Sequence, residues 1–186
     1  PTRFIWGLNR TSNRKFIHSL LAPVDTFLRQ WDFAAAQRVD YFIANSKVVQ
    51  QRIKQFYKRD SEVIYPPVVD STKLHSQEST EKFFLAVSRL ERLKNVEVII
   101  RAFNTLGLPL KVVGTGSQQE YLASIAGSTV EMLGYLDDDE RNRLYASCRA
   151  LVVATENEDF GMTIPEVQSF GRPVIGLRSG GYVESI

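Results

Sequence analysis

From Lys82 onward, short apolar runs alternate with segments of helical periodicity. Each run is rich in Val, Leu and Ile and does not alternate in polarity, which is typical of strands covered on both faces. The predicted strands are Phe83–Val87, Leu110–Val113, Val130–Leu133, Ala150–Ala154 and Pro173–Gly176. The predicted helices are Val96–Leu106, Ser117–Ile125, Asp137–Ser147, Met162–Phe170 and one that begins near Gly181. This alternation predicts an α/β fold with a Rossmann-like, doubly wound parallel sheet and right-handed crossovers.

Residues 1–65 are predicted to belong to a different domain from residues 66–186. The first part is also β/α, but it is too small to close a sheet of its own. Its predicted elements are a helix over Arg14–Val39 interrupted at Pro23, a strand at Tyr41–Ala44, a helix over Ser46–Tyr57 capped by Asn45 or Ser46, and a strand at Glu62–Ile64. Two prolines at 66 and 67 and the polar segment Ser71–Thr80 predict an interdomain linker. The chain lacks an initiator methionine and stops as a helix begins, so we expect it to be cut at both ends.

Composition narrows the possible partners. The 186 residues are 44% hydrophobic and 24% charged, as in ordinary globular proteins, with a formal net charge of +2. This charge is too small to indicate nucleic acid as a partner. Cys148 is the single cysteine, so no internal disulfide can form, and a reducing cytoplasmic location is expected. Because Cys148 lies in a helical, apolar stretch, we expect a buried thiol rather than a nucleophile.

Several chemically useful residues follow the predicted strands. In an open parallel sheet, ligands bind outside the carboxyl ends of the strands, near the point where strand order reverses. Arg89 and Lys94 follow the first strand, and a guanidinium and an ammonium group suit a diphosphate; exposed surface residues are the alternative. Gly114 and Gly116 follow the second strand and let a backbone approach a ligand, although any tight turn can contain such glycines.

Glu158 and Glu166 stand eight residues apart after the fourth strand and enclose Phe160-Gly161-Met162-Thr163. The amides from Gly161 to Ile164 are expected to point out of the start of a helix, where they can bind an anion. Glu158 can accept hydrogen bonds from sugar hydroxyls, and Glu166 can bind a diol such as a ribose. The alternatives are a loop charge for Glu158 and an exposed helix face for Glu166.

The segment Glu158–Glu166 resembles the Glu-x7-Glu signature of retaining GT-B glycosyltransferases, specifically glycosyltransferase family four. Further stretches resemble the same family in the same order: Ile43–Ser46, Val63–Val68, Ser88–Leu90 with Lys94, Val113–Gly116, Leu133–Tyr135 and Gly171–Ile175. The resemblance extends over nearly the whole chain and is nearest to mannosyltransferases of bacterial and archaeal surface polysaccharides.

This resemblance implies a role for each site residue. Arg89 and Lys94 bind the donor diphosphate and stabilise the leaving group, and Glu158 binds the donor hexose. Glu166 binds the ribose, and the backbone near Tyr135 meets the base. The implied catalytic residues are Arg89, Lys94 and Glu158, and the implied donor-binding residues are Gly114, Gly116, Tyr135, Phe160, Gly161, Met162, Thr163 and Glu166. The resemblance favours transfer with retention on one face, with the leaving phosphate assisting the acceptor hydroxyl; double displacement with a carboxylate nucleophile is the other route.

The resemblance also defines the expected substrates and the extent of the chain. The donor is a nucleotide sugar, GDP-mannose or a UDP-sugar, and the acceptor is a glycan or a lipid-linked glycan; no other cofactor is implied. Residues 1–65 correspond to the end of the acceptor-side N-terminal domain. Residues 66–186 correspond to the donor-binding domain without its last strand and C-terminal helices. The family's N-terminal histidine precedes Pro1–Phe4, and we expect His18 and His75 to be surface residues without that role.

Three alternatives remain open from the sequence. A nucleotide-sugar epimerase of the same architecture would need an acid and a base outside this chain, and a non-catalytic nucleotide-binding module would show no sugar preference. The aromatic residues Phe16, Phe27, Trp31 and Phe33 are expected to form a buried stripe of the first helix; peripheral contact with a membrane is the alternative. Asp137-Asp138-Asp139 is expected to cap a helix rather than to bind a metal, and no metal site is predicted.

Overall fold

The computed structural model describes residue 6, residues 15–68 and residues 82–186. The chain divides into two compact units, Pro1–Tyr65 (the N-terminal unit) and Pro66–Ile186 (the C-terminal unit). Several expectations lie outside the described residues, namely the strand at Pro1–Phe4, the linker Ser71–Thr80, His75 and the side chains of Phe16 and His18. The assignment of the two units to an acceptor side and a donor side stays a prediction.

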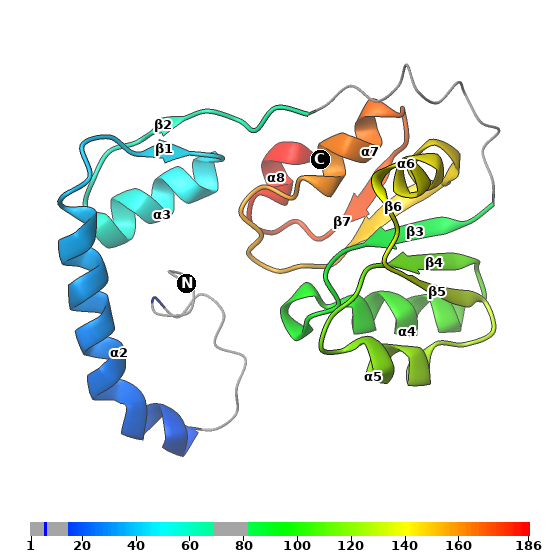
Figure 1. The fold of residues 1–186 in the computed structure, drawn as a ribbon, viewed down its shortest axis with the longest axis horizontal. Coiled ribbons are helices and arrows are strands. Elements are labelled where there is room, and N and C mark those ends of the chain that lie inside the picture. Colours follow the sequence, from blue (N-terminus) through cyan, green and yellow to red (C-terminus); the bar gives the residue numbers. More distant parts are fainter. Residues whose placement is uncertain (1–5, 7–14, 69–81) are drawn as a thin grey trace. The chain divides into compact units, whose positions relative to one another are not determined.

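The C-terminal unit is built on a five-stranded parallel sheet with the order β5-β4-β3-β6-β7 (Figure 1). Its strands are β3 (Phe84–Val87), β4 (Leu110–Val113), β5 (Val130–Gly134), β6 (Ala150–Val153) and β7 (Val174–Gly176). The chain builds the sheet outward from β3 to β5 and then returns to place β6 on the other side of β3. Strand order therefore reverses between β3 and β6, and the predicted doubly wound fold is confirmed.

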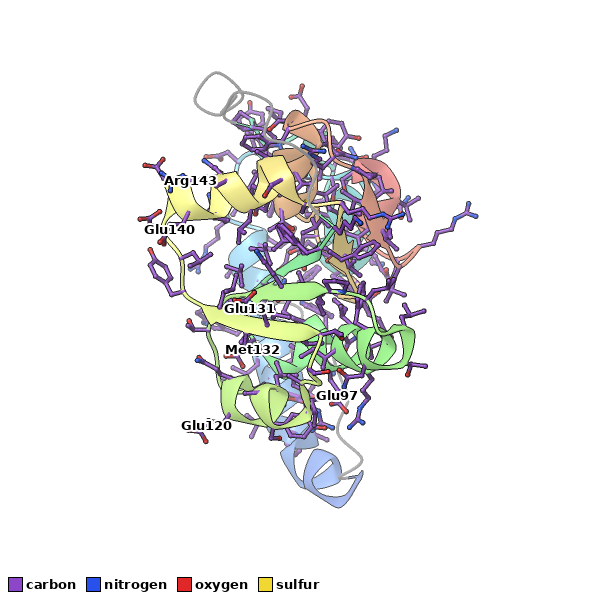
Figure 2. The ribbon with its side chains drawn as sticks, turned by 90° about the vertical axis from the view of Figure 1, so that its right-hand side faces the viewer. Glu97, Glu120, Glu131, Met132, Glu140 and Arg143 are labelled. Atoms are coloured by element: carbon purple, nitrogen blue, oxygen red, sulfur yellow. The ribbon has the colours of Figure 1, made fainter. Side chains whose placement is uncertain are left out.

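Helices cover both faces of this sheet. The elements are η1 (Arg92–Lys94), α4 (Val96–Leu106), α5 (Gln119–Ile125), α6 (Asp138–Ser147), α7 (Thr163–Ser169) and α8 (Tyr182–Ser185). Helices α4 and α5 lie on one side of the strands, whereas α6, α7 and α8 lie on the other (Figure 1). In Figure 2, labelled residues mark the two sides of the sheet. Glu97 and Glu120 belong to α4 and α5 on one side, and Glu140 and Arg143 belong to α6 on the other.

Neighbouring residues of each strand pack into two cores on opposite faces of the sheet, because side chains alternate across a sheet. Leu85 of β3 is packed with α6, α7 and α8, and the next residue, Ala86, is packed with α4 and α5. Both are almost fully buried, which explains why the strands read as continuous apolar runs. At the edge of the sheet, β5 carries Met132 against the second core, whereas Glu131 on the opposite face is exposed (Figure 2).

A local sequence signal explains where α6 begins. Asp137 accepts a hydrogen bond from the Glu140 amide at 2.8 Å, and the Glu140 side chain accepts one from the Asp137 amide at 3.2 Å. This reciprocal pair is a capping box, so the predicted capping role of Asp137 is confirmed.

The N-terminal unit contains α2 (Lys15–Ala36), β1 (Ile43–Ala44), α3 (Lys47–Tyr57) and β2 (Glu62–Val63). Strands β1 and β2 pair in parallel, and Ser46 caps α3 by accepting a hydrogen bond from the Val49 amide. The predicted interruption at Pro23 is wrong, because α2 continues through this residue. Proline removes only one donor from a helix, and the turns on both sides keep their own hydrogen bonds.

The expected buried stripe of α2 is also wrong for the residues whose side chains are described. Phe27 is 65% exposed, Trp31 is 61% exposed and Phe33 is 37% exposed. The contact between α2 and α3 uses Asp32 instead, which accepts hydrogen bonds from Tyr57 and Trp6. Among the helices of the described residues, none combines the length and apolarity needed to cross a bilayer.

Candidate functional site

The turn after β3 brings Lys94 to Glu158. Lys94 ends η1, and its Nζ lies 2.5 Å from Oε2 of Glu158 in the loop after β6. The two side chains are only 22% and 14% exposed, so this ion pair is partly shielded from water. Asn95 fixes the turn, because its backbone is left-handed (φ 52°) and its side-chain amide donates to the Ala154 carbonyl at the end of β6. Since β3 and β6 are neighbours, the reversal of strand order joins two residues that stand 64 positions apart.

The loop of Glu158 is supported by the turn between β7 and α8. The Gly181 amide donates to the Glu158 carbonyl at 2.7 Å, and Ser179 Oγ accepts a hydrogen bond from the Asn157 amide at 3.2 Å. A Cβ on Gly180 would lie 2.5 Å from the Glu158 carbonyl oxygen, so the two backbones touch. The predicted parallel sheet puts these residues at the same edge of the sheet but does not predict this support, for which the adjacent glycines are the available signal.

The side chain of Glu166 accepts a hydrogen bond from a buried tyrosine. Tyr145 of α6 is fully buried, and its hydroxyl donates to Glu166 Oε2 at 3.0 Å. Burial, and then the nearby carboxylate, raise the pKa of Tyr145 well above its usual range, so the hydroxyl stays protonated. Glu166 is half-buried, which corrects the alternative of an exposed helix face.

A cavity of about 230 Å³ lies against Glu166, between α6 and α7. The residues from these helices and their edges that line it include Asp138, Arg141, Asn142, Met162, Glu166 and Phe170. It therefore brings together two of the predicted donor-binding residues, Met162 and Glu166. Its other lining side chains offer both charged groups and an aromatic ring.

The start of α7 offers fewer amides than expected. The Ile164 amide donates to the Gly161 carbonyl at 3.0 Å, so the expectation that Ile164 contributes to an anion site is wrong. Gly161 (φ 84°), Met162 and Thr163 donate no backbone hydrogen bond within the part of the chain that the structure describes. Phe160, just before them, is buried.

The packing of two turns explains why glycine stands at positions 114 and 116. A Cβ on Gly114 would lie 1.9 Å from the Ser88 carbonyl oxygen, and one on Gly116 would lie 2.5 Å from that of Leu90. The turn after β4 thus packs directly on the turn after β3, and the Leu90 amide donates to the Thr115 carbonyl at 2.8 Å. The glycines are needed here whether or not a ligand approaches, and their role toward a donor stays a prediction.

Arg89 and Tyr135 lie at the same ends of the strands but are not drawn into these contacts. Arg89 is exposed, and Tyr135, at 78%, is among the most exposed aromatic residues described. The acid nearest to Arg89 along the chain, Glu91, is already bonded to the amide and hydroxyl of Ser117. These hydrogen bonds, and more weakly the charge of Arg89, lower the pKa of Glu91.

In the described part of the chain, neither the cysteine nor the acidic side chains form a second reactive centre. Cys148 is fully buried, and burial raises its pKa to about 11, so the expected unreactive thiol is confirmed. Among residues 15–68 and 82–186, no cluster of three or more His, Cys, Asp or Glu side chains is placed to bind a metal.

Comparisons with known proteins agree with the fold of the C-terminal unit. A profile of the family described as "Glycosyl transferases group 1" matches residues 70–186. An uncharacterized glycosyltransferase of Methanocaldococcus jannaschii is 28% identical over 156 residues, which cover 82% of this chain and 44% of the relative. O-antigen chain mannosyltransferase C of Escherichia coli is 27% identical over 183 residues, covering 90% of this chain and 47% of the relative. The structure of Anabaena HepE in complex with UDP and glucose matches with a TM-score of 0.66 at 24% identity, over 81% of this chain and 47% of that one. The chain spans less than half the length of these three proteins.

Proposed function

Because this chain belongs to the group 1 glycosyltransferases, also called glycosyltransferase family four, we propose that it binds the nucleotide-sugar donor of a retaining hexosyltransferase. Its five-stranded parallel sheet has the fold of a GT-B glycosyltransferase domain. The chain is shorter than its relatives, so activity, substrates and partners are proposed for the protein as a whole.

The ion pair of Lys94 and Glu158 is the observation that carries the proposal. It joins a cation and a carboxylate where strand order reverses, the place at which open α/β sheets bind their ligands. A diphosphate is an anion and pairs with a cation such as Lys94. The hydroxyls of a sugar ring donate hydrogen bonds to a carboxylate such as Glu158, so a sugar diphosphate needs both groups side by side. A purely structural surface pair would need no such position.

The proposed chemistry depends on the charge of the leaving group. As the bond from the sugar to the diphosphate breaks, negative charge grows on the phosphate oxygens, and Lys94 and Arg89 stabilise it. Glu158 binds hydroxyls of the hexose, and Glu166 binds the ribose diol beside the cavity between α6 and α7. The amides of Gly161, Met162 and Thr163 and the backbone near Tyr135 supply the remaining contacts to the donor.

For the donor we propose GDP-mannose first and a UDP-sugar second. The named relative from Escherichia coli is a mannosyltransferase, which favours mannose, whereas the HepE structure contains UDP and glucose, which favours uridine. The acceptor is proposed to be a glycan or a lipid-linked glycan, met in the cytoplasm or at the inner face of a membrane.

A thermal-shift panel with GDP, UDP, GDP-mannose, UDP-glucose and NAD tests the proposal. A ligand at a hundred times its dissociation constant stabilises a protein by about 2.7 kcal/mol, which moves the midpoint by several degrees. We expect a shift with one nucleotide and a larger shift with its sugar conjugate. A shift without sugar preference would indicate a nucleotide-binding module instead, and no shift with any compound would refute the donor site.

A further inference from the structure

Tyr145 stands out among the buried residues because, within the described part of the chain, its hydroxyl forms one hydrogen bond, and this bond goes to a proposed ligand-binding carboxylate. Its ring is in the core formed with α7 and α8, where Phe170 packs at 6.1 Å between ring centroids. A hydroxyl in such surroundings needs a partner, since an unsatisfied buried donor is destabilising. Tyr145 finds this partner in Glu166, 21 residues further along the chain.

The same contact restricts Glu166. A glutamate side chain has several rotatable bonds, and on a half-exposed helix face it normally samples many of them. Here Oε2 is tied to a rigid, fully buried ring, whereas Oε1 accepts no hydrogen bond from the residues that the structure describes. The cavity between α6 and α7 lies against Glu166, and Tyr145 is not among its lining residues.

We propose that Tyr145 is a positioning residue, which fixes the Glu166 carboxylate so that it can recognise the ribose diol of the donor. The inference rests on the proposed function and extends it to a residue that does not line the cavity. A carboxylate held in one orientation does not have to be ordered when the ligand binds, so affinity for the diol increases. The bond to a charged acceptor is also stronger than one between neutral groups.

The test compares nucleoside diphosphates with and without a ribose hydroxyl. Isothermal titration would measure the affinity of the wild type and of Tyr145→Phe for the nucleoside diphosphate preferred in the panel and for its 2′-deoxy and 3′-deoxy analogues. In the wild type we expect at least one deoxy analogue to bind about 10-fold more weakly, as is usual when a charged hydrogen bond is lost. In Tyr145→Phe we expect this ratio to fall below about 3-fold, because Glu166 is no longer oriented.

Two variants separate positioning from simple loss of stability. Cys148→Ala alters the same core one turn away and should keep the wild-type ratio, even if its midpoint of unfolding falls. In a Glu166→Ala background, Tyr145→Phe should change the ratio no further. Tyr145→Phe should fold, because the half-exposed Glu166 can bind water in place of the hydroxyl.

The outcomes also separate this inference from the proposed function. An unchanged ratio in Tyr145→Phe would overturn the inference, and so would a wild type that binds the nucleotide without distinguishing its deoxy analogues; donor binding would stand in both cases. A wild type that binds no nucleoside diphosphate would overturn both.

Discussion

In the proposed site, a diphosphate has to compete with Glu158 for the ammonium group of Lys94, and this competition can be measured. Lys94 Nζ lies 2.5 Å from Glu158 Oε2, and both side chains are largely shielded from water. In Glu158→Gln the charge that competes for Lys94 is removed, so the ammonium group is available to an anionic ligand. We therefore expect this variant to bind a nucleoside diphosphate without sugar more tightly than the wild type does.

The size of the effect follows from the exposure of the pair. Breaking a fully buried ion pair costs about 3–5 kcal/mol, and an exposed one contributes about 0–1 kcal/mol. Exposed fractions of 22% and 14% place this pair between these limits, at about 1–3 kcal/mol of folding stability. Part of this energy opposes ligand binding, so Glu158→Gln should gain about 3- to 10-fold in affinity, or about 0.6–1.4 kcal/mol.

The assay is isothermal titration of the wild type, Glu158→Gln, Lys94→Met and the double variant with GDP and UDP. Lys94→Met should lose about 10-fold or more in affinity, and the double variant should resemble it, because Glu158 acts on the diphosphate mainly through Lys94. The gain of Glu158→Gln should shrink at about 0.5 M salt, where charges are more strongly screened.

For the sugar part of the donor, we expect Glu158→Gln to lower the affinity rather than raise it. Glu158→Gln should lose the additional affinity that a nucleotide sugar has over its nucleoside diphosphate, while gaining affinity for the diphosphate itself. A variant that binds both compounds more weakly, or a double variant whose effects are additive, would refute the reasoning that Lys94 is shared between the carboxylate and the ligand.

Two further predictions concern the support of the site and its buried thiol. Gly180→Ala and Gly107→Ala place a Cβ at similar positive φ angles of 59° and 65°, but only the first meets a neighbouring backbone. In urea denaturation we expect a loss of about 1 kcal/mol for Gly107→Ala, from the left-handed backbone alone, and of more than about 2 kcal/mol for Gly180→Ala; equal losses would contradict the close approach. For Cys148, a pKa raised from 9.0 to about 11 leaves about 100-fold less thiolate near pH 8, so iodoacetamide should label the folded chain at least that much more slowly than the unfolded chain. Labelling at the rate of an exposed cysteine would contradict the burial of Cys148 in this core.

Much of the fold could be predicted because burial on both faces leaves a clear trace in the sequence. The runs around Leu85 and Leu151 are continuous and apolar since each strand lies between two layers of helices. The start of α6 was predictable for a different reason, because a capping box is encoded within four residues. Such signals are local, and local signals can be read without knowing the rest of the structure.

The contacts of the site could be predicted only in part, because they depend on residues that are distant in the chain. The sequence predicts Lys94 and Glu158 each as a site residue, but their ion pair follows from the adjacency of β3 and β6. Tyr145 gave no signal, since a tyrosine within an apolar helix face resembles any other core aromatic residue. The exposed Trp31 shows the opposite error, in which an apolar stripe was assumed to be buried although nothing in the N-terminal unit covers it among the described residues.

Of the two cations of the proposed site, one is in an ion pair and the other is exposed, and this difference affects the rates at which a donor binds and leaves. Lys94 is bonded to Glu158, whereas Arg89 is exposed and its neighbour Glu91 is satisfied by Ser117. An approaching diphosphate can therefore meet Arg89 without breaking a hydrogen bond or ion pair among the described residues, but it reaches Lys94 only by exchanging places with a carboxylate. Exposed charges act mainly on association, and groups that lose a partner on binding act mainly on dissociation. Arg89 should thus govern how fast the donor arrives, and Lys94 should govern how long it stays.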